Sequence, residues 1–189
     1  MSFPSFSAGE VLTAADMNAV GLWKIAEGTL SGTATNFANV FSSTYDNYVI
    51  TLSAVSFSGA GDLYWQWLTN TTPLTVGAYN WAYTAHTVSN AGNSSGTSGQ
   101  TFGYTGISNS APVAGARVAS GTYTIFGPMN STYERQIVMG QAFSFRGDWV
   151  VTNIAGAYNA NVAPRNGIRF LTSSASTMNG IVRIYGQRL

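Results

Sequence analysis

The sequence predicts an all-β protein, an antiparallel β-sandwich of the jelly-roll type, preceded by a short N-terminal arm and helix. After Gly28, runs rich in β-branched and aromatic residues recur at short intervals. Clusters of Gly, Asn, Ser and Pro separate these runs, as turns do between antiparallel strands. No stretch after Gly28 has the pattern of a helix of ten residues, which argues against an alternating βαβ architecture.

The N-terminal segment differs from the rest of the chain. Thr13 is a suitable N-cap, and Asp16 follows it at a position that favours an acidic side chain. Good helix formers occupy residues 14–20, and Gly21 is a natural helix stop. The segment therefore predicts one short helix of about two turns.

Before this helix, the aromatic residues near Pro4 suggest an extended arm. The apolar side chains of the arm and helix are too few to form a core alone, so we expect them to pack on the body of the protein or on another chain. The candidate docking and oligomerisation residues are Phe3, Phe6, Val11, Leu12, Met17 and Trp23. A frayed terminus is the alternative. The expected organisation is an arm and helix over residues 1–27 and a β-sandwich over residues 28–189.

The body is expected to contain about nine strands. Each run combines strand-forming residues with flanking turn signals. The predicted strands cover residues 48–52, 63–68, 79–88, 101–107, 117–126, 133–145, 149–155, 167–171 and 180–188.

Residues 89–100 form a low-complexity stretch of Gly, Ser and Asn. Such a stretch buries too little apolar area to offset the entropy lost on ordering. It predicts a flexible hairpin loop, or a loop ordered against a neighbouring subunit or a ligand.

Composition narrows the classes of function. The chain has 189 residues, no cysteine, 8% charged residues and a net charge of +1, while Ser, Thr, Asn and Gly make up 78 residues. High apolar content argues against disorder, and the lack of thiols excludes a disulfide scaffold and a Cys-ligated metal. The few dispersed basic residues argue against a nucleic-acid-binding face. A near-neutral surface promotes association and favours a protein that works in an assembly.

The sequence carries no signal for secretion or membrane insertion. Residues 1–6 lack a basic region followed by an apolar one, so no signal peptide is expected. No window reaches 18 consecutive apolar residues, which a transmembrane helix would need.

The sequence contains few residues that are suited to catalysis. His86 is the lone histidine, no G-x-S-x-G elbow occurs, and the glycines form no phosphate-binding loop. The carboxylates show no calcium-loop spacing, and turn formation or surface pairing accounts for them. They are Glu10, Asp16, Glu27, Asp46, Asp62, Glu134 and Asp148. We therefore predict a protein that is not an enzyme, with no catalytic, cofactor-binding or metal-binding residue.

The aromatic residues allow three interpretations. Trp65 and Trp67 share one face of a strand, and Tyr79, Trp81 and Tyr83 share a face of another. Such rows fill a sandwich core, form a subunit interface or stack against sugar rings. If the rings stack against sugars, the predicted glycan contacts are Trp65, Trp67 and Trp81. The alternation of side chains along a strand does not show which face is inward, so the three interpretations stay open.

Three segments resemble a known group of proteins. Residues 6–18, Phe-Ser-Ala-Gly-Glu-Val-Leu-Thr-Ala-Ala-Asp-Met-Asn, are similar to the F-x-x-G-x-x-L-T-A-A-D-[LMF]-N start of many tailed-phage virion proteins. Residues 180–188, Gly-Ile-Val-Arg-Ile-Tyr-Gly-Gln-Arg, resemble the C-terminal strand of the same group, with Gln187 where an apolar residue is usual. Residues 39–48 resemble the stretch F-s-s-x-Y-d-x-Y that precedes a strand there.

The resemblance implies a structural subunit of a phage virion, made in the host cytoplasm and oligomeric, most commonly a homotrimer. A tail-fibre or tail-tip component that contacts other virion proteins and host surface glycans is the first hypothesis. A capsid decoration or head-fibre protein is the alternative, and a carbohydrate-binding module is a further one. None of the motifs is catalytic, so no active-site residue is carried over.

Overall fold

The computed structural model describes residues 21–89, 92–109, 118–130, 136–145, 148–160 and 163–187. These residues form thirteen strands and no helix. The strands are β1 (Leu22–Leu30), β2 (Ala34–Phe37), β3 (Asn47–Phe57), β4 (Gly61–Thr69), β5 (Thr72–Pro73), β6 (Tyr79–Thr87), β7 (Gly92–Gln100), β8 (Gly103–Asn109), β9 (Ala119–Phe126), β10 (Gln136–Phe145), β11 (Trp149–Tyr158), β12 (Gly167–Thr172) and β13 (Met178–Gln187).

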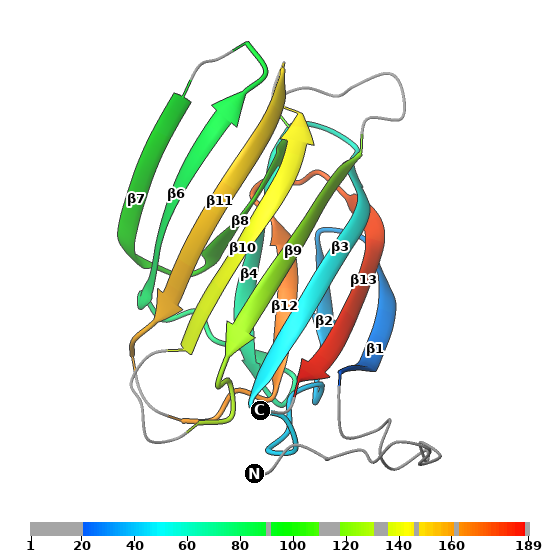
Figure 1. Ribbon diagram of the computed structural model, residues 1–189, viewed down its shortest axis with the longest axis vertical. Coiled ribbons are helices and arrows are strands. Elements are labelled where there is room, and N and C mark those ends of the chain that lie inside the picture. Colours follow the sequence, from blue (N-terminus) through cyan, green and yellow to red (C-terminus); the bar gives the residue numbers. More distant parts are fainter. Residues whose placement is uncertain are drawn as a thin grey trace, which may run out of the picture.

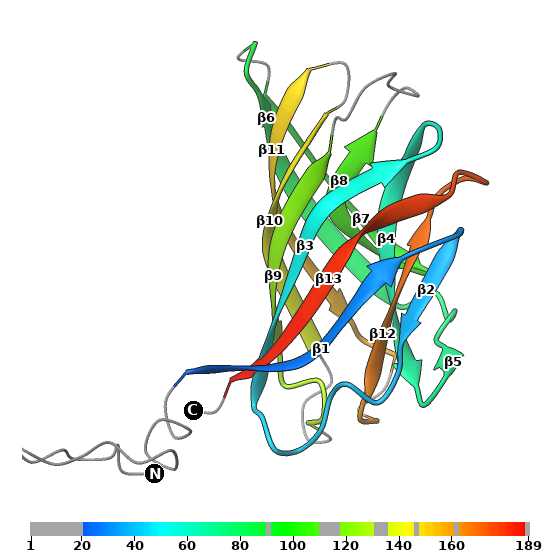
Figure 2. The same ribbon diagram turned by 90° about the vertical axis from the view of Figure 1, so that its right-hand side faces the viewer.

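The strands form one continuous sheet that is nearly closed, like a barrel. The path runs β1-β13-β3-β9-β10-β8-β4-β12-β2, with β5 paired to β4. All of its pairings are antiparallel except β10 with β8, a parallel contact between Phe145 and Asn109 that makes the sheet mixed. The first and last strands of the path, β1 and β2, are joined by a tight turn at residues 31–33 and nearly close the sheet (Figure 2).

Three further strands extend from β10 and form what we call the wing: β11, β6 and β7. β11 pairs with β10 along its whole length, β6 pairs with β11, and β7 pairs with β6. All three pairings are antiparallel, and β7 is the outer strand at the left of Figure 1. The wing therefore continues one wall of the barrel beyond the point where the path turns to β8.

The predicted all-β class is confirmed, and the finer architecture differs from the prediction. The predicted antiparallel sandwich of the jelly-roll type is not confirmed, because the strands join in a single mixed sheet. The predicted helix at residues 13–20 lies outside the described residues. The predicted boundary between residues 27 and 28 falls inside β1, which pairs with β13 from Leu22 to Leu30. Residues 22–27 thus belong to the β body.

All nine predicted strands occur within the described residues, and residues 117, 133–135 and 188 of the predicted ranges lie outside them. The prediction omitted β1, β2 and β5, and it assigned residues 22–27 of β1 to the arm region. The loop predicted over residues 89–100 is wrong for residues 92–100, which form β7. Backbone pairing with β6 orders this stretch without burying its small polar side chains.

Alternating side chains fill the interior, and aromatic rings make up much of it. In β13, for example, Val182 and Ile184 are fully buried while their neighbours are exposed or half-buried. A chain of ring contacts, with centroids 4.6 to 5.9 Å apart, crosses the core. Its members are Tyr48, Phe41, Trp67, Trp65, Tyr79 and Tyr158.

Some of the buried aromatic rings lie over glycines on neighbouring strands. Gly103 of β8 is the cross-strand partner of Trp65, and a methyl group on it would overlap the indole. Tyr123 covers its partner Gly140 in the same way. A glycine beneath an aromatic ring lets the ring lie flat across the sheet, which replaces the packing that the glycine itself lacks.

Gly103→Ala should destabilise the protein by about 1 to 3 kcal/mol, because the new methyl group displaces the buried Trp65 ring. Chemical denaturation followed by tryptophan fluorescence measures this difference. Gly96→Ala is the matched control, since a methyl group there meets its neighbours at 3.4 Å or more. Equal free energies of unfolding for the two variants would contradict the packing argument.

Candidate functional site

The first candidate region is the end of the body at which β1 begins and β13 ends. Leu22 and Gln187 are cross-strand partners there, so the chain that precedes residue 21 joins the body beside the C-terminal strand (Figures 1 and 2). We call this region the arm-proximal end. It contains Trp23, Phe41, Tyr45, Tyr48 and Gly186.

At the arm-proximal end, aromatic rings join two of the segments that resemble phage virion proteins. Tyr45 packs on Gly186 of the C-terminal strand, and a methyl group on that glycine would overlap its ring. On its other sides Tyr45 contacts Trp23 of β1 at 6.0 Å and Tyr48 at 5.9 Å between ring centroids. Residues 39–48 and 180–187, far apart in sequence, therefore form one packed unit with the start of β1.

Hydrogen bonds hold this unit in place. The buried Tyr48 hydroxyl accepts from the backbone N–H of Ser42 (2.7 Å) and donates to its carbonyl (2.9 Å). The backbone N–H of Asp46 donates to the carbonyl of Gln187 (3.1 Å), and the Asp46 carbonyl accepts from Gly127 (3.0 Å). The loop of residues 38–46 is thus tied both to β3 and to the end of β13.

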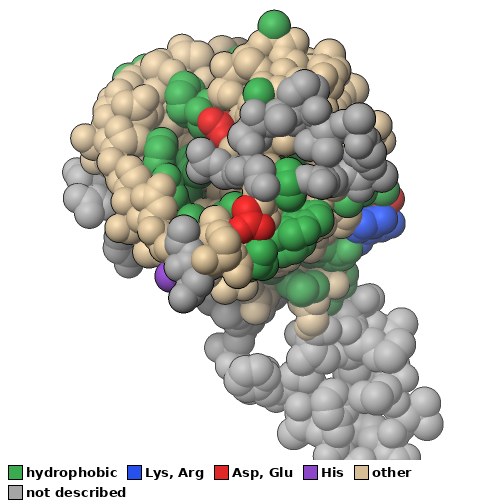
Figure 3. Space-filling view, turned by 90° about the horizontal axis from the view of Figure 1, so that it is seen from above, with side chains coloured by type: hydrophobic (Ala, Val, Ile, Leu, Met, Phe, Trp, Pro, Cys, Tyr) green, Lys and Arg blue, Asp and Glu red, His purple; other side chains and the backbone are tan. Residues whose placement is uncertain are grey.

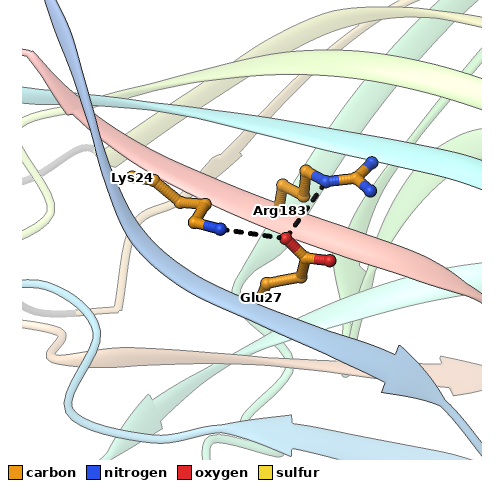
Figure 4. A network of polar contacts seen from close by, with 3 residues as sticks. All are labelled: Lys24, Glu27 and Arg183. Carbon is orange, nitrogen blue, oxygen red and sulfur yellow. Dashed lines mark hydrogen bonds and ion pairs between the residues drawn. The ribbon is translucent and has the colours of Figure 1, made fainter.

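One ion-pair network crosses from β1 to β13 on the outer surface. Glu27 Oε2 lies 3.2 Å from Lys24 Nζ and 3.2 Å from Arg183 Nε (Figure 4). The hydrogen bond from Lys24 and the charge of Arg183 hold the pKa of the Glu27 carboxyl below its usual value. Because the network is exposed, we interpret it as a contact that links β1 to β13 and not as a reactive site.

The predicted docking residues divide into two groups. Phe3, Phe6, Val11, Leu12 and Met17 lie outside the described residues. Trp23 is half-buried in β1 and packs against Tyr45, so it belongs to the body, close to the first described residue.

The second candidate region is a cluster of five rings between the wing and the wall formed by β4 and β8. We call it the aromatic groove; in the view of Figure 3, hydrophobic side chains gather inside a hollow on the side where β6 and β7 lie. Tyr104 lies at its centre, with ring centroids 5.2 to 5.9 Å from three neighbours. The rings are Tyr64, Trp81, Tyr83, Phe102 and Tyr104.

Two of the ring pairs in the groove are stacked. Tyr64 and Phe102 lie 4.0 Å apart at an interplanar angle of 20°, and Trp81 and Tyr83 lie 6.0 Å apart at 25°. These four side chains are half-buried, unlike Trp65 and Trp67, which are 2% and 0% exposed. The groove therefore presents aromatic surface that the core does not enclose.

Small polar side chains of β7 line the groove beside Trp81 and Tyr83. Thr97 is the cross-strand partner of Trp81 and Ser95 that of Tyr83, so each pair shares one face of the sheet. Asn93 continues the same face of β7. Hydroxyl and amide groups thus stand next to the rings.

The groove also holds one carboxylate and one unpaired donor. The Tyr64 hydroxyl donates to Asp62 Oδ2 (3.3 Å), and burial together with the charge of Asp62 raises the pKa of Tyr64 to about 12. The indole N–H of Trp81 is buried and has no hydrogen-bond partner among the described residues. An unpaired buried N–H is uncommon in folded proteins.

The sequence predicted this region only in part. Of the three predicted glycan contacts, Trp65 and Trp67 are core residues that no ligand reaches, and Trp81 is in the groove. Tyr64, Phe102 and Tyr104 were missed as site residues. Tyr64 and Trp65 are adjacent in β4, so their side chains point to opposite faces of the strand. This alternation was the signal in the sequence for a second aromatic face.

The described residues contain no cluster of groups suited to catalysis or metal binding. No three His, Cys, Asp or Glu side chains come together within them. Asp148 accepts from the backbone N–H groups of Trp149 (2.8 Å) and Ser89 (3.1 Å), and bonds from Ser89 lower the pKa of its carboxyl. His86 is exposed on β6. The part of the chain that the structure covers also includes no helix able to cross a bilayer.

No family model, curated protein or solved structure matches the chain.

Tyr48→Phe should lower the free energy of unfolding by about 1 to 3 kcal/mol, because it leaves both backbone groups of Ser42 without their buried partner. Thermal and chemical denaturation measure the loss. Tyr185→Phe, on the outer face of the adjacent strand, is the control and should change stability little. The same small effect at both sites would show that the loop does not depend on this hydroxyl.

The Glu27 network should make stability depend on pH. Because the folded-state pKa of Glu27 is lowered, its contribution is complete above the unfolded value of 4.5 and is lost as pH falls through the folded pKa. Glu27→Gln should therefore reduce the melting temperature slightly at neutral pH and leave it unchanged at about pH 2. High salt should remove the difference at neutral pH, since exposed ion pairs are screened. A difference that persists at about pH 2 would refute this account.

Proposed function

We propose that this protein is a structural, non-enzymatic subunit of a phage particle, attached through its arm-proximal end. The observation that carries the proposal is the contact between the segments that resemble phage virion proteins. Residues 39–48 and 180–188 resemble that group separately, and Tyr45 on Gly186 joins them in space. The third resembling segment, residues 6–18, precedes β1, which starts at the same end of the body.

The surface chemistry supports an assembled protein. With 8% charged residues and a net charge of +1, copies of the chain repel one another weakly. Apolar side chains are also exposed on the outer face of neighbouring strands, including Met139 (50%), Phe143 (42%) and Val151 (44%). Such side chains favour contact with another protein surface, and a homotrimer is the proposed assembly.

Within the particle, we favour a tail-fibre or tail-tip component over a capsid decoration or head-fibre protein. The resemblance fits both positions, and the copy number separates them. Quantitative mass spectrometry of purified particles should find tens of copies for a fibre component and hundreds for a decoration protein.

Removal of residues 2–20 tests the role of the arm. The cut leaves Gly21 and β1 in place, so the body should fold with an unchanged melting temperature. The truncated protein should fail to enter particles during infection, and its mass in solution, measured by light scattering, should fall to that of a monomer. Tyr185→Phe in the full chain is the control for incorporation.

Normal incorporation and an unchanged oligomer after the truncation would refute attachment through the arm. A loss of folding, seen by circular dichroism, would instead contradict the assignment of the body to residues 22–187.

A further inference from the structure

The aromatic groove has the composition of a ligand site rather than of a core. Its rings come from three places in the chain: Tyr64 on β4, Trp81 and Tyr83 on β6, and residues 102 and 104 at the start of β8. Rings that only fill space are enclosed by apolar neighbours, as Trp67 is. Here four of the five rings remain half-exposed, and one wall is polar.

The polar wall consists of small uncharged groups at regular spacing. Asn93, Ser95 and Thr97 are alternate residues of β7 and lie on one face. Their hydroxyl and amide groups both donate and accept hydrogen bonds. They stand beside Trp81 and Tyr83, so a ligand on these rings meets hydrogen-bonding groups at its edge.

This combination selects a class of ligand. Sugar rings offer flat C–H faces for aromatic rings and hydroxyl groups for a polar wall. The five rings and the β7 wall carry no cation, and Asp62 adds a negative charge beside Tyr64, which disfavours anionic ligands. We propose that the aromatic groove binds a neutral saccharide, with Trp81 and Tyr83 as the stacking platform and Asn93, Ser95 and Thr97 as hydrogen-bonding partners.

The wall is held in place, as a binding site requires. At one end of the β6–β7 hairpin, the Gly99 N–H donates to Asn80 Oδ1 (3.1 Å). At the other end, the Val88 N–H donates to the carbonyl of Trp149 (3.1 Å), and the Ser89 N–H donates to Asp148 (3.1 Å). A preorganised wall reduces the entropy lost when a ligand binds.

A proline-rich peptide is the main competing ligand, because it also docks on aromatic grooves. The β7 side chains that face Trp81 and Tyr83 are hydroxyls, which favours a saccharide.

The inference does not depend on the proposed function. The groove involves the wing, whereas the arm-proximal end lies at the start of β1, on the opposite side of the molecule in Figure 1. Variants of the groove should therefore leave incorporation into particles unchanged, and removal of residues 2–20 should leave saccharide binding unchanged. Each proposal can fail without the other.

The experiment screens the full chain against an array of neutral oligosaccharides of glucose, galactose, mannose and N-acetylglucosamine, with sialylated and sulfated glycans and a polyproline peptide alongside. Calorimetry then measures the affinity for the best neutral ligand. Tyr83→Ala and Trp81→Ala should each weaken binding roughly tenfold or more, and binding should change the fluorescence of the wild type more than that of Trp81→Ala.

Exposed wall residues supply variants that do not disturb packing. Ser95→Ala and Asn93→Ala should weaken binding by a smaller factor, and Ser95→Phe should block it by filling the groove. Phe143→Ala is the matched control, because it removes a 42% exposed aromatic side chain on another face. It should bind the saccharide as the wild type does.

Three results would overturn the proposal. They are no binding to any neutral saccharide on the array, preferred binding of the anionic glycans or of the polyproline peptide, and full affinity in Ser95→Phe. The last result remains decisive if the tryptophan and tyrosine variants fail to fold.

Discussion

The structure depends on aromatic rings that lie over glycines of neighbouring strands. Phe37 of β2 covers Gly28 of β1, at the seam where the two ends of the strand path approach each other. Trp65 covers Gly103 and thereby joins β4 to β8, and Tyr45 covers Gly186 at the arm-proximal end. Each contact replaces a side chain that the glycine lacks and holds the segment that carries the ring close to a neighbouring strand. The barrel closure, the β4–β8 wall and the arm-proximal end therefore use the same kind of contact.

The outer face of the sheet carries a row of polar side chains, although the chain has few charged residues. A row of cross-strand partners crosses eight strands on the outer face, and hydroxyl and amide groups occupy most of it. The row consists of Ser94, Thr84, Asn153, Gln141, Thr122, Thr51, Arg183 and Glu27. Within it Gln141 Nε2 donates to Asn153 Oδ1 (2.8 Å), and only the β1 end is closed by an ion pair. Neutral hydrogen-bonding groups thus keep this face hydrated, as charged residues do on most surfaces. The aromatic rings beneath the sheet stabilise the fold.

The sequence predicted the strands better than their assembly. Runs such as residues 149–155 carry period-two alternation, which is a local property and was sufficient to locate β11. The parallel contact of Phe145 with Asn109 turns two sets of strands into one sheet, and it depends on tertiary geometry that no local pattern contains. β7 was missed because its ordering comes from pairing with β6, while its composition is that of a linker. For the site, Trp81 was found by its ring, whereas Tyr104 and Phe102 acquire their role only when β8 lies beside the wing.

The two proposed regions lie on different parts of the sheet, and this arrangement is consistent with both proposals. β1 begins beside the end of β13, in the nearly closed barrel, whereas the groove lies between the wing and the wall formed by β4 and β8. A subunit fixed to a particle through the arm would hold the barrel end close to its neighbours and leave the wing as the part that other molecules can reach. The wing would then be the place for a ligand site, because a groove at the arm-proximal end would be covered by assembly. Trp81, Tyr83 and the polar wall occur on the wing, while the rings near Gly186 are packed against one another, and this agrees with the division.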